Sequence, residues 1–451
     1  MPGVNVTNWF GDIASQPSVV VDANSSDEVA AILKDSAKYP SPVRAAGSSH
    51  STTPCGALEG GTLVRMANMN RILSLTADSV TCEAGALYID IAQELEKQGL
   101  QFFVNTEIGN LSAGSAGCCG TKDGSMPGEY GQVGSYVTGV KMVLPSGDRL
   151  EVDETQPELL QKVRSSYGTF GIVTETTFRV GPIRPMAVYH QTFSTDDFVS
   201  KLPELIARGE SMMYYVFPFE NLVTVEFRKY NPGASGLPNR IVWPLRNYFW
   251  GTAGPAFCRR VEAEVPDKTI RYGVIDGFCA LWRFKLTDIV KSDNTIARDQ
   301  MIRYPHPADD SRYTFSFWAF PEASFPAAFT SYNKFCRDYY QQKGYRSNMI
   351  SVGYRVAKDQ ESLLSYSYDN TTMTVDPVST ANPGWEAFLD AYNELCSRQG
   401  GIPLLNQTAR VTPAQVQAGL GDRLKIFAQE RKKYDPANRL LNPFFRSLLG
   451  E

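Results

Sequence analysis

The stretch Val43-Arg-Ala-Ala-Gly-Ser-Ser-His-Ser51 decides how the first part of this chain is interpreted. Its first four residues predict a buried strand, and Gly-Ser-Ser predicts a turn directly after that strand. Successive backbone N–H groups in such a turn can form a concave anion site, and two serine hydroxyls add further donors. A pyrophosphate suits this turn. The stretch is not a Rossmann fingerprint, because no G-x-G-x-x-G opens a helix here.

Strands and helices alternate around this stretch. Ser-Ser-Asp-Glu at residues 25–28 marks the start of one predicted helix, and Gly99 marks the end of another. This order predicts sheets that are covered by helices. The predicted strands are 18–22, 42–46, 62–66, 79–85, 137–144 and 149–152, and the predicted helices are 26–34 and about 87–97.

Eight glycines lie between Gly109 and Gly134, counting both ends. That density is too high for a helix or a central strand, whereas glycine lets the backbone pass close to a neighbouring group. Because predicted strands flank the segment on both sides, we expect it to run along something large and flat rather than to be disordered.

The composition changes at about residue 181, where aromatic strands begin. These strands and the helices that follow them predict one antiparallel sheet with helices on one face. The strands are expected at 213–219, 223–227 and 313–321, and the helices near 323–343, 385–399 and 413–433.

Composition and charge narrow the possible functions. The 451 residues are 43% apolar, which is enough for two domains with cores of their own. The net charge is −4 without a basic cluster, so neither a nucleic acid nor a membrane surface is expected as a partner. No signal peptide or membrane span is recognised. The eight cysteines lack zinc spacing, so we expect reduced thiols, no metal and a cytoplasmic location.

Five stretches, in this order, resemble the vanillyl-alcohol-oxidase/p-cresol-methylhydroxylase (PCMH-type) superfamily of FAD proteins. Each stretch alone is a weak signal, but together they cover most of the chain. The first stretch, Arg44–Ser51, resembles R-x-x-G-x-x-H-S, and the second, Gly85-Ala-Leu-Tyr, resembles the family's glycine before a helix. The third, Asn110–Thr121, resembles the Gly-rich flavin segment. The fourth, Tyr167–Glu175, resembles G-x-x-G-I-V/I-T, and the fifth, Asp435–Phe445, resembles the closing D-P-x-x-x-F/L-L-N.

The resemblance implies an α+β fold with two domains. Residues 1–180 would form the PCMH-type FAD-binding domain of two α/β subdomains, with 411–451 packing back near it, and 181–410 a substrate domain whose antiparallel sheet is flanked by helices. The residues that the resemblance places at FAD are Arg44, Ala46, Gly47, Ser48, Ser49, His50, Ser51, Gly109, Ser112, Gly114, Ser115, Gly117, Cys118, Gly120, Thr121, Gly171, Ile172, Val173 and Asn442.

His50 is one of only three histidines in the chain. On its own it is interpreted as a loop histidine bonded to backbone, but the resemblance implies a covalent bond from its ring to the flavin 8α-methyl group. Bicovalent relatives add a cysteine in the Gly-rich segment. The spacing of Cys118 and Cys119 does not match that pattern, so we interpret them as packing residues. His190 and His306 have no motif around them and are expected to be structural.

Within the superfamily, the chain most resembles the aldonolactone/alditol oxidases, with decaprenylphosphoryl-ribose oxidases near by. Three positions depart from their patterns. Lys122 replaces the histidine of T-H-G, and Gly353 replaces the acid of Glu-x-Arg although Arg355 is retained. Gln407 takes the place of a late lysine. These departures weaken the case for a polyol or sugar-lactone substrate.

The implied reaction is the oxidation of an alcohol or hydroxy acid by hydride transfer to flavin N5, followed by reoxidation by O₂ with peroxide release. The protein must supply orientation, a proton acceptor and charge near the flavin. Arg355 is a candidate anchor for an anionic group, although a surface salt bridge is the alternative. Tyr354 is a candidate proton acceptor, Lys122 borders the flavin site, and Gln407 offers a polar contact. Beyond these, Tyr366 is a second candidate acceptor, Asn406 a second polar contact, and Gly114 a candidate oxygen gate.

Other functions remain compatible with the same motifs. They are flavin-dependent amine oxidation or oxidative cyclisation in secondary metabolism, a dehydrogenase with another electron acceptor, a reductase driven by NADPH, and a flavin-binding protein without catalysis. The expected partners are a small-molecule substrate and O₂ or another acceptor, with a monomer or homodimer as the assembly.

Overall fold

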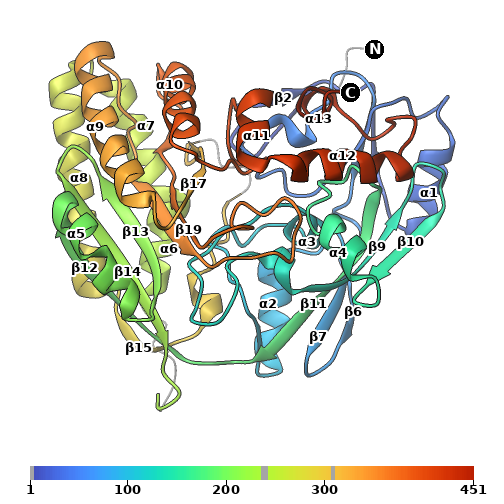
Figure 1. The fold of residues 1–451 in the computed structure, drawn as a ribbon, viewed down its shortest axis with the longest axis horizontal. Coiled ribbons are helices and arrows are strands. Elements are labelled where there is room, and N and C mark those ends of the chain that lie inside the picture. The colour runs from blue at the N-terminus through green and yellow to red at the C-terminus, as the bar shows by residue number, and fades with distance from the viewer. Residues whose placement is uncertain (1–4, 235–241, 306–309) are drawn as a thin grey trace.

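The computed structural model describes residues 5–234, 242–305 and 310–451. His306 lies outside these residues. In Figure 1, the strands and helices before residue 181 lie on the right with the C-terminal helices, and those that follow residue 181 lie on the left. The main hydrophobic core extends through both parts of the chain, from Trp9 and Val29 to Phe445.

The first subdomain is a three-stranded parallel sheet in the order β3-β5-β4, accompanied by α1. Its strands are short and apolar, and Val43 and Val64 are fully buried. The helix begins where the sequence predicts, because the Ser25 side chain accepts a hydrogen bond from the Glu28 N–H. The elements are β3 (Val19–Asp22), α1 (Ser26–Lys34), β4 (Val43–Ala46), η1 (Pro54–Gly56) and β5 (Thr62–Arg65).

The second subdomain is an antiparallel sheet in the order β10-β9-β11-β7-β6, with β8 paired to the far end of β11. Helix α2 ends before Gly99, which has a positive φ of 71°, as predicted. The elements are β6 (Ile72–Leu75), β7 (Ser79–Glu83), α2 (Tyr88–Lys97), β8 (Leu100–Phe102), α3 (Ala113–Cys118), η2 (Val133–Tyr136), β9 (Val137–Val143), β10 (Arg149–Asp153), α4 (Pro157–Val163) and β11 (Ile172–Pro182).

The Gly-rich segment contains a short helix, so the expectation that no helix forms there is wrong. Helix α3 packs closely on β11, because a Cβ atom at Gly117 would lie only 2.8 Å from the side chain of Thr176. Its other residues are Ala, Gly, Ser and Cys, which are small enough for the same close approach. Glycine serves here to let a helix approach a sheet.

The chain after residue 181 forms one seven-stranded antiparallel sheet in the order β15-β12-β14-β13-β18-β19-β17. The predicted strand 313–321 is divided into β16 and β17, which pair with different strands. The strands are β12 (Met186–Ser194), β13 (Ser211–Phe217), β14 (Leu222–Tyr230), β15 (Ser292–Thr295), β16 (Thr314–Phe315), β17 (Trp318–Pro321), β18 (Ser351–Val356), β19 (Thr372–Val375) and β20 (Val378–Ser379).

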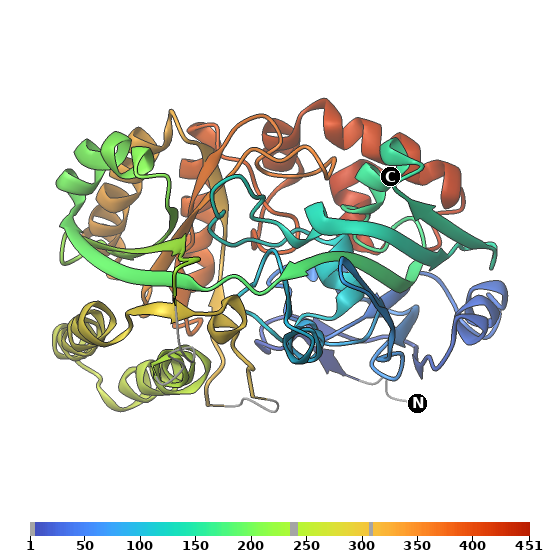
Figure 2. The same ribbon diagram turned by 90° about the horizontal axis from the view of Figure 1, so that it is seen from below.

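Helices cover both faces of this sheet, so the expectation of one covered face is wrong (Figure 2). Side chains alternate along β13, where Tyr214 packs toward α5 and α9, and Tyr215 stacks on Trp250 from the other side. The helices are α5 (Thr195–Ala207), α6 (Trp243–Tyr248), η3 (Phe249–Ala253), α7 (Gly254–Glu264), α8 (Lys268–Ile289), η4 (Ala297–Gln300), α9 (Phe325–Lys343) and α10 (Trp385–Arg398).

The C-terminal segment returns to the first subdomain. One predicted helix is two, because Gly421 adopts φ 58° and ψ −140° between α11 (Pro413–Leu420) and α12 (Asp422–Tyr434). The last helix is α13 (Pro443–Leu449). The N–H of Val43 donates to the carbonyl of Arg439 at 2.8 Å, next to β4. The division of the chain at residues 181 and 411 into domains stays a prediction.

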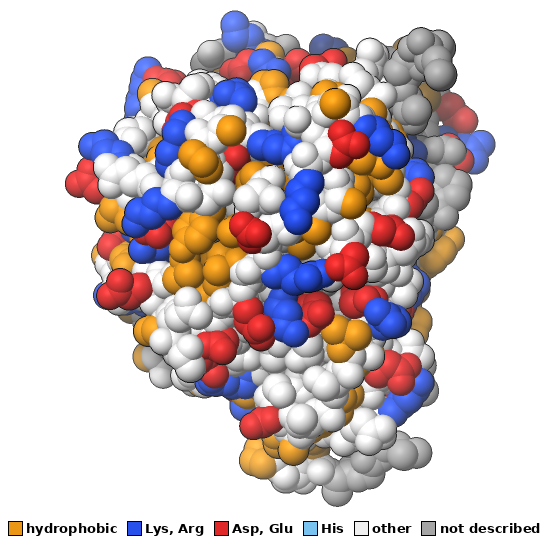
Figure 3. Space-filling model, turned by 90° about the vertical axis from the view of Figure 1, so that its right-hand side faces the viewer, with side chains coloured by type: hydrophobic (Ala, Val, Ile, Leu, Met, Phe, Trp, Pro, Cys, Tyr) orange, Lys and Arg blue, Asp and Glu red, His pale blue; other side chains and the backbone are white. Residues whose placement is uncertain are grey.

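Among the described residues, no helix combines the length and apolarity needed to cross a bilayer. Residues 5–234, 242–305 and 310–451 also contain no group of three His, Cys, Asp or Glu side chains placed to hold a metal ion. Figure 3 shows the right-hand side of Figure 1, where basic and acidic side chains are interspersed. The absence of nucleic-acid, membrane and metal partners stays a prediction.

Candidate active site

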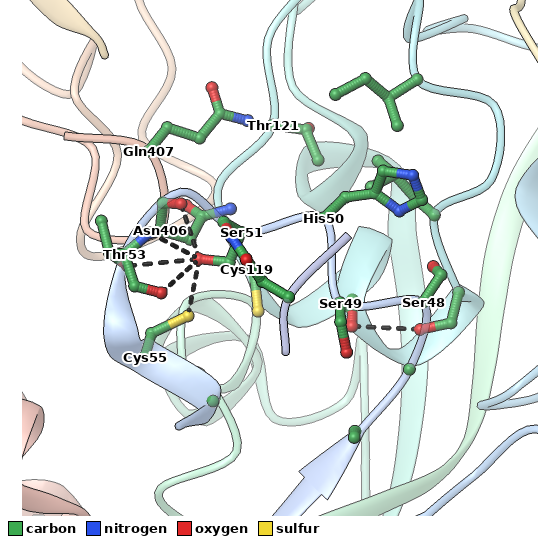
Figure 4. Close-up of a pocket in the computed structure, with 18 of the residues that line it drawn as sticks. Ser48, Ser49, His50, Ser51, Thr53, Cys55, Cys119, Thr121, Asn406 and Gln407 are labelled. Carbon is green, nitrogen blue, oxygen red and sulfur yellow. Dashed lines mark hydrogen bonds between the residues drawn. The ribbon is translucent and has the colours of Figure 1, made fainter. Parts of the chain in front are cut away.

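A cavity of about 250 Å³ lies between the turn after β4, the Gly-rich segment and the aromatic strands (Figure 4). It brings together residues from both parts of the chain. The predicted FAD and catalytic residues that line it are Arg44, Ala46, Gly47, Ser48, Ser49, His50, Ser51, Ser112, Gly114, Ser115, Cys118, Gly120, Thr121, Val173, Lys122, Tyr354 and Gln407. Six other predicted residues do not line the cavity, namely Gly109, Gly117, Gly171, Ile172, Asn442 and Arg355.

The turn after β4 needs a residue without a side chain at its first position. A Cβ atom at Gly47 would lie 2.0 Å from the Oγ of Ser112, so only glycine lets the turn lie against α3. Ser49 adopts a positive φ of 56°, which bends the chain toward His50. The turn is held by Ser51, whose Oγ donates to the carbonyl of Asn406 at 2.8 Å (Figure 4).

Arg44 holds the wall of the cavity together. It is buried, and its guanidinium donates to the carbonyls of Tyr167 at 2.6 Å and of Cys55 at 2.9 Å. It also donates to the carbonyls of Gly168 and Leu440, both at 3.1 Å. All these acceptors are backbone groups, so Arg44 joins the first subdomain to the C-terminal segment.

His50 lies in the wall of the cavity and is buried. Its ring stacks on Trp9, with ring centroids 5.2 Å apart and an interplanar angle of 19°. Phe10 and Tyr304 also pack against it. The ring orientation is therefore fixed by aromatic neighbours, among which Tyr304 also lines the cavity.

The donor set of this cavity fits FAD. The turn from Gly47 to Ser51 offers backbone and hydroxyl donors to a pyrophosphate, as an anion site requires. At the other side, the amide oxygens of Asn406 and Gln407 line the cavity, are buried and have no partner among the described residues. Buried polar atoms of this kind are ordinarily satisfied by a bound group.

Lys122 lines the cavity and forms a buried ion pair with Asp376. Its Nζ also lies over the rings of Phe315 at 4.7 Å and Tyr354 at 5.5 Å. Burial lowers the pKa of Lys122, against the opposing effect of the Asp376 charge. Burial raises the pKa of Asp376 to about 6.

Tyr354 and Glu107 form the second polar group of the cavity, and both line it. The Tyr354 hydroxyl donates to Glu107 Oε2 at 2.7 Å, and the other oxygen of Glu107 pairs with Arg246, which is fully buried. Burial, with the Glu107 charge next to it, raises the pKa of Tyr354 well above its usual value. Tyr354 is therefore a protonated donor in the resting protein.

The predicted catalytic residue Arg355 does not line the cavity. Successive residues of a strand point to opposite faces, and on β18 Val352 and Tyr354 are the ones that line the cavity. Arg355 forms a salt bridge with Glu322 outside it. Gly353 also faces the other way, since a Cβ atom there would lie 2.1 Å from the ring of Tyr214.

The other candidates outside the cavity support its walls. Gly109 and Gly117 pack against neighbouring elements, Gly171 lies against Val143 directly before β11, and the buried Ile172 begins that strand. Asn442 caps α13 and donates to the carbonyls of Pro54 and Ala57, both at 2.9 Å. These residues shape the site without facing into it.

Sequence reasoning missed several residues that line the cavity. Glu107 precedes the Gly-rich segment by two residues and carries no motif, and the aromatic residues come from stretches that read as ordinary core. Among the missed residues are Glu107, Trp250, Tyr304, Tyr313 and Phe315. The Tyr304 and Tyr313 hydroxyls are hydrogen-bonded at 2.6 Å. Cys118 and Cys119 also face the cavity, and burial raises the pKa of Cys118 to about 12.

Comparison with known proteins places this site in a family. Residues 17–153 match the FAD binding domain family, and residues 309–448 match the D-arabinono-1,4-lactone oxidase family. An L-gulono-1,4-lactone dehydrogenase of Mycobacterium tuberculosis is 21% identical over 447 residues, which cover 98% of this chain and 99% of that protein. A D-lactate dehydrogenase of Anaerostipes hadrus is 33% identical over 179 residues, and the match spans only 37% of its length and 37% of this chain.

The fold is shared with a solved oxidase. The crystal structure of cholesterol oxidase from B. sterolicum aligns with a TM-score of 0.76 and 16% identity, covering 99% of this chain and 96% of that one. The chain belongs to the vanillyl-alcohol-oxidase/PCMH superfamily of FAD-dependent oxidoreductases. Within it, the chain lies near the aldonolactone oxidases, and a CH–OH substrate is consistent with both family matches. The predicted family and fold class are confirmed.

Proposed function

We propose that the chain holds FAD in the cavity of Figure 4, bonded covalently to His50, and oxidises a CH–OH group of a small molecule beside Tyr354 and Lys122. One observation supports the proposal most. A single cavity is lined by the donor-rich turn at Gly47–Ser51, by the Gly-rich segment, and by the polar groups Lys122, Glu107 and Tyr354. Anion binding, flavin packing and proton transfer are therefore available side by side.

When bound, FAD supplies a hydride acceptor at its N5 atom. The chain's own residues must then remove the hydroxyl proton of the substrate. In this proposal the substrate hydroxyl donates to the oxygen of Tyr354, whose own proton moves along the existing 2.7 Å hydrogen bond to Glu107. Arg246 holds the Glu107 carboxylate in place for that transfer. The ammonium of Lys122 supplies positive charge next to the reacting groups.

The covalent bond, the electron acceptor and the location are parts of the same proposal. The buried ring of His50, fixed by Trp9, supports the tether. O₂ is the proposed acceptor, with Gly114 on the cavity wall as the candidate gate. A reducing, cytoplasmic location is supported by eight free cysteines. The assembly as monomer or homodimer is carried over from the sequence.

The proposal is tested by anaerobic titration of the purified protein with alcohols, hydroxy acids, amines and NADPH. We expect at least one alcohol to bleach the flavin absorbance, and peroxide to appear when air is admitted. Bleaching by amines alone, or by NADPH alone, would instead establish an amine oxidase or a reductase. A flavin that no compound bleaches would contradict catalysis.

A further inference from the structure

The end of the cavity next to Lys122 has an apolar wall, which we call the aromatic end. Five of its residues are Trp250, Phe315, Val352, Tyr354 and Val378, and all of them are buried. They come from η3, β16, β18 and β20, so four separate elements contribute to one surface. Rings and branched aliphatic side chains of this kind suit a planar apolar group.

The charged groups at the aromatic end form two closed ion pairs. Lys122 pairs with Asp376, whose side chain is 0% exposed, and Arg246 pairs with Glu107 from behind, also with 0% exposure. Each pair has a net charge of zero. Neither cation can turn to a new anion without leaving a carboxylate buried and unpaired, which is costly.

The remaining cation that lines the cavity is Arg44, which comes from β4 and not from the elements of the aromatic end. Arg44 donates to four backbone carbonyls and is buried among them. Among the described residues, the Lys and Arg side chains that line the cavity are Lys122, which is paired with Asp376, and Arg44, whose Nε is buried without a partner. A substrate carboxylate or phosphate at the aromatic end would be desolvated without a counter-ion.

From this arrangement we infer that the substrate is an uncharged alcohol whose carbinol carbon carries an aromatic or similarly apolar group, rather than a hydroxy acid or a sugar lactone. The polar side chains that the contacts place at the aromatic end are Tyr354 itself, Glu107, which accepts from it, and Lys122, and each of them already has a partner. They serve one hydroxyl, whereas a sugar presents several hydroxyls that each need a partner. The inference rests on the proposed function, because it names the substrate class of the same site.

The test compares two ligands that differ chiefly in charge. 1-Phenylethane-1,2-diol and mandelate share a ring and a carbinol carbon, but mandelate carries a carboxylate. Their dissociation constants are measured on the purified protein by perturbation of the flavin spectrum under anaerobic conditions and by tryptophan fluorescence. We expect the diol to bind at least about tenfold more tightly, because the carboxylate has no counter-ion. L-Gulono-1,4-lactone is the third ligand, and we expect it to bind more weakly than the diol.

A charge-removing variant sharpens the test. Glu107→Gln removes the carboxylate that neutralises Arg246, so the affinity for mandelate relative to that for the diol should rise about tenfold. Glu322→Gln is the matched control, because Glu322 pairs with Arg355 outside the cavity, and it should change neither constant. Equal binding of diol and mandelate by the wild type, or tighter binding of the lactone, would overturn the inference.

The two proposals fail separately. If the flavin is bleached by mandelate or the lactone and not by any aryl alcohol, the inferred substrate class is wrong while the proposed oxidase stands. If the expected binding order is found but no ligand bleaches the flavin, the pocket chemistry is supported and the proposed oxidation is contradicted.

Discussion

Lys122 and Asp376 lie 254 positions apart in the sequence and form a buried ion pair in the wall of one cavity. Lys122 extends from the Gly-rich segment, and Asp376 follows directly after β19 of the seven-stranded sheet. The pair therefore joins the two parts of the chain at the site where the substrate is proposed to react.

The pair can be tested as a unit. Lys122→Met leaves a carboxylate buried without an ion partner, so the free energy of unfolding should fall by about 3–5 kcal/mol. Asp376→Asn also breaks the pair, but burial favours a neutral side chain at this position, so it should destabilise less than Lys122→Met. The double variant removes both charges, and it should be more stable than either single variant. Urea unfolding of the four proteins measures these values, and a double variant that loses the sum of both single effects would show that the two charges are not coupled.

The raised pKa of Asp376 also predicts that the stability of the protein depends on pH. Its pKa in the folded protein is about 6, above the ordinary value of 3.8, because burial disfavours the charged form. Between these values the folded chain keeps a proton that the unfolded chain releases. The contribution of Asp376 to stability is therefore fully present below pH 3.8 and is lost as the pH rises through about 6. Asp376→Asn should remove this pH-dependent component.

The rate of flavin reduction should depend on the same titration of Asp376. Below pH 6, neutral Asp376 leaves Lys122 without its counter-charge, so the rate of flavin reduction should change with an apparent pKa of about 6. Asp359→Asn is the control, because burial also raises the pKa of Asp359 to about 6, although Asp359 lies outside the cavity. If the kinetic pKa disappeared in Asp359→Asn and persisted in Asp376→Asn, the attribution of this titration to Asp376 would be contradicted.

Tyr354 is expected to act in proton transfer. Tyr354→Phe removes the hydroxyl that donates to Glu107, so kcat should fall about 100-fold or more while KM changes little. Tyr366→Phe is the matched control, since its hydroxyl donates to the carbonyl of Thr121 and does not line the cavity. It should reduce stability with little effect on kcat. Equal effects of both variants on kcat would argue against a proton-transfer role.

Gly47 is expected to be required for FAD binding. In a His50→Ala background, where no covalent bond forms, Gly47→Ala should weaken FAD binding at least about tenfold, which corresponds to about 1.4 kcal/mol. The cause is the clash between the new methyl group and Ser112, which forces the turn away from α3. Gly56→Ala is the control, since Gly56 also lines the cavity but a Cβ there meets nothing within 4 Å. Flavin fluorescence titration measures both, and equal affinities would contradict the account of this turn.

The sequence alone was sufficient to predict those parts of the site that are formed by residues next to one another in the chain. The turn at Gly47–Ser51 and most of the Gly-rich segment line the cavity, because the residues that act together are neighbours in the chain. Helix α1 begins and ends where predicted, since its caps are local interactions. These features depend on backbone chemistry within a few residues.

The sequence alone was insufficient to predict those parts of the site that depend on strand register or on packing between residues far apart in the chain. Arg355 was chosen by motif similarity, but a shift of one residue on β18 moves a side chain to the other face, and Tyr354 faces the cavity instead. Glu107 gains its role only from Arg246 and Tyr354, which tertiary packing brings to it. Nothing near Glu107 in sequence marks such partners.

The central claim is that this cavity holds FAD through His50, and the absorption spectrum before and after acid precipitation tests it most directly. The purified wild-type protein should show flavin absorbance that stays with the acid pellet. His50→Ala should bind FAD and release it into the acid supernatant. If both proteins release the flavin, the covalent bond is contradicted while FAD binding stands. If neither protein contains flavin nor takes up added FAD, the account of the cavity is contradicted.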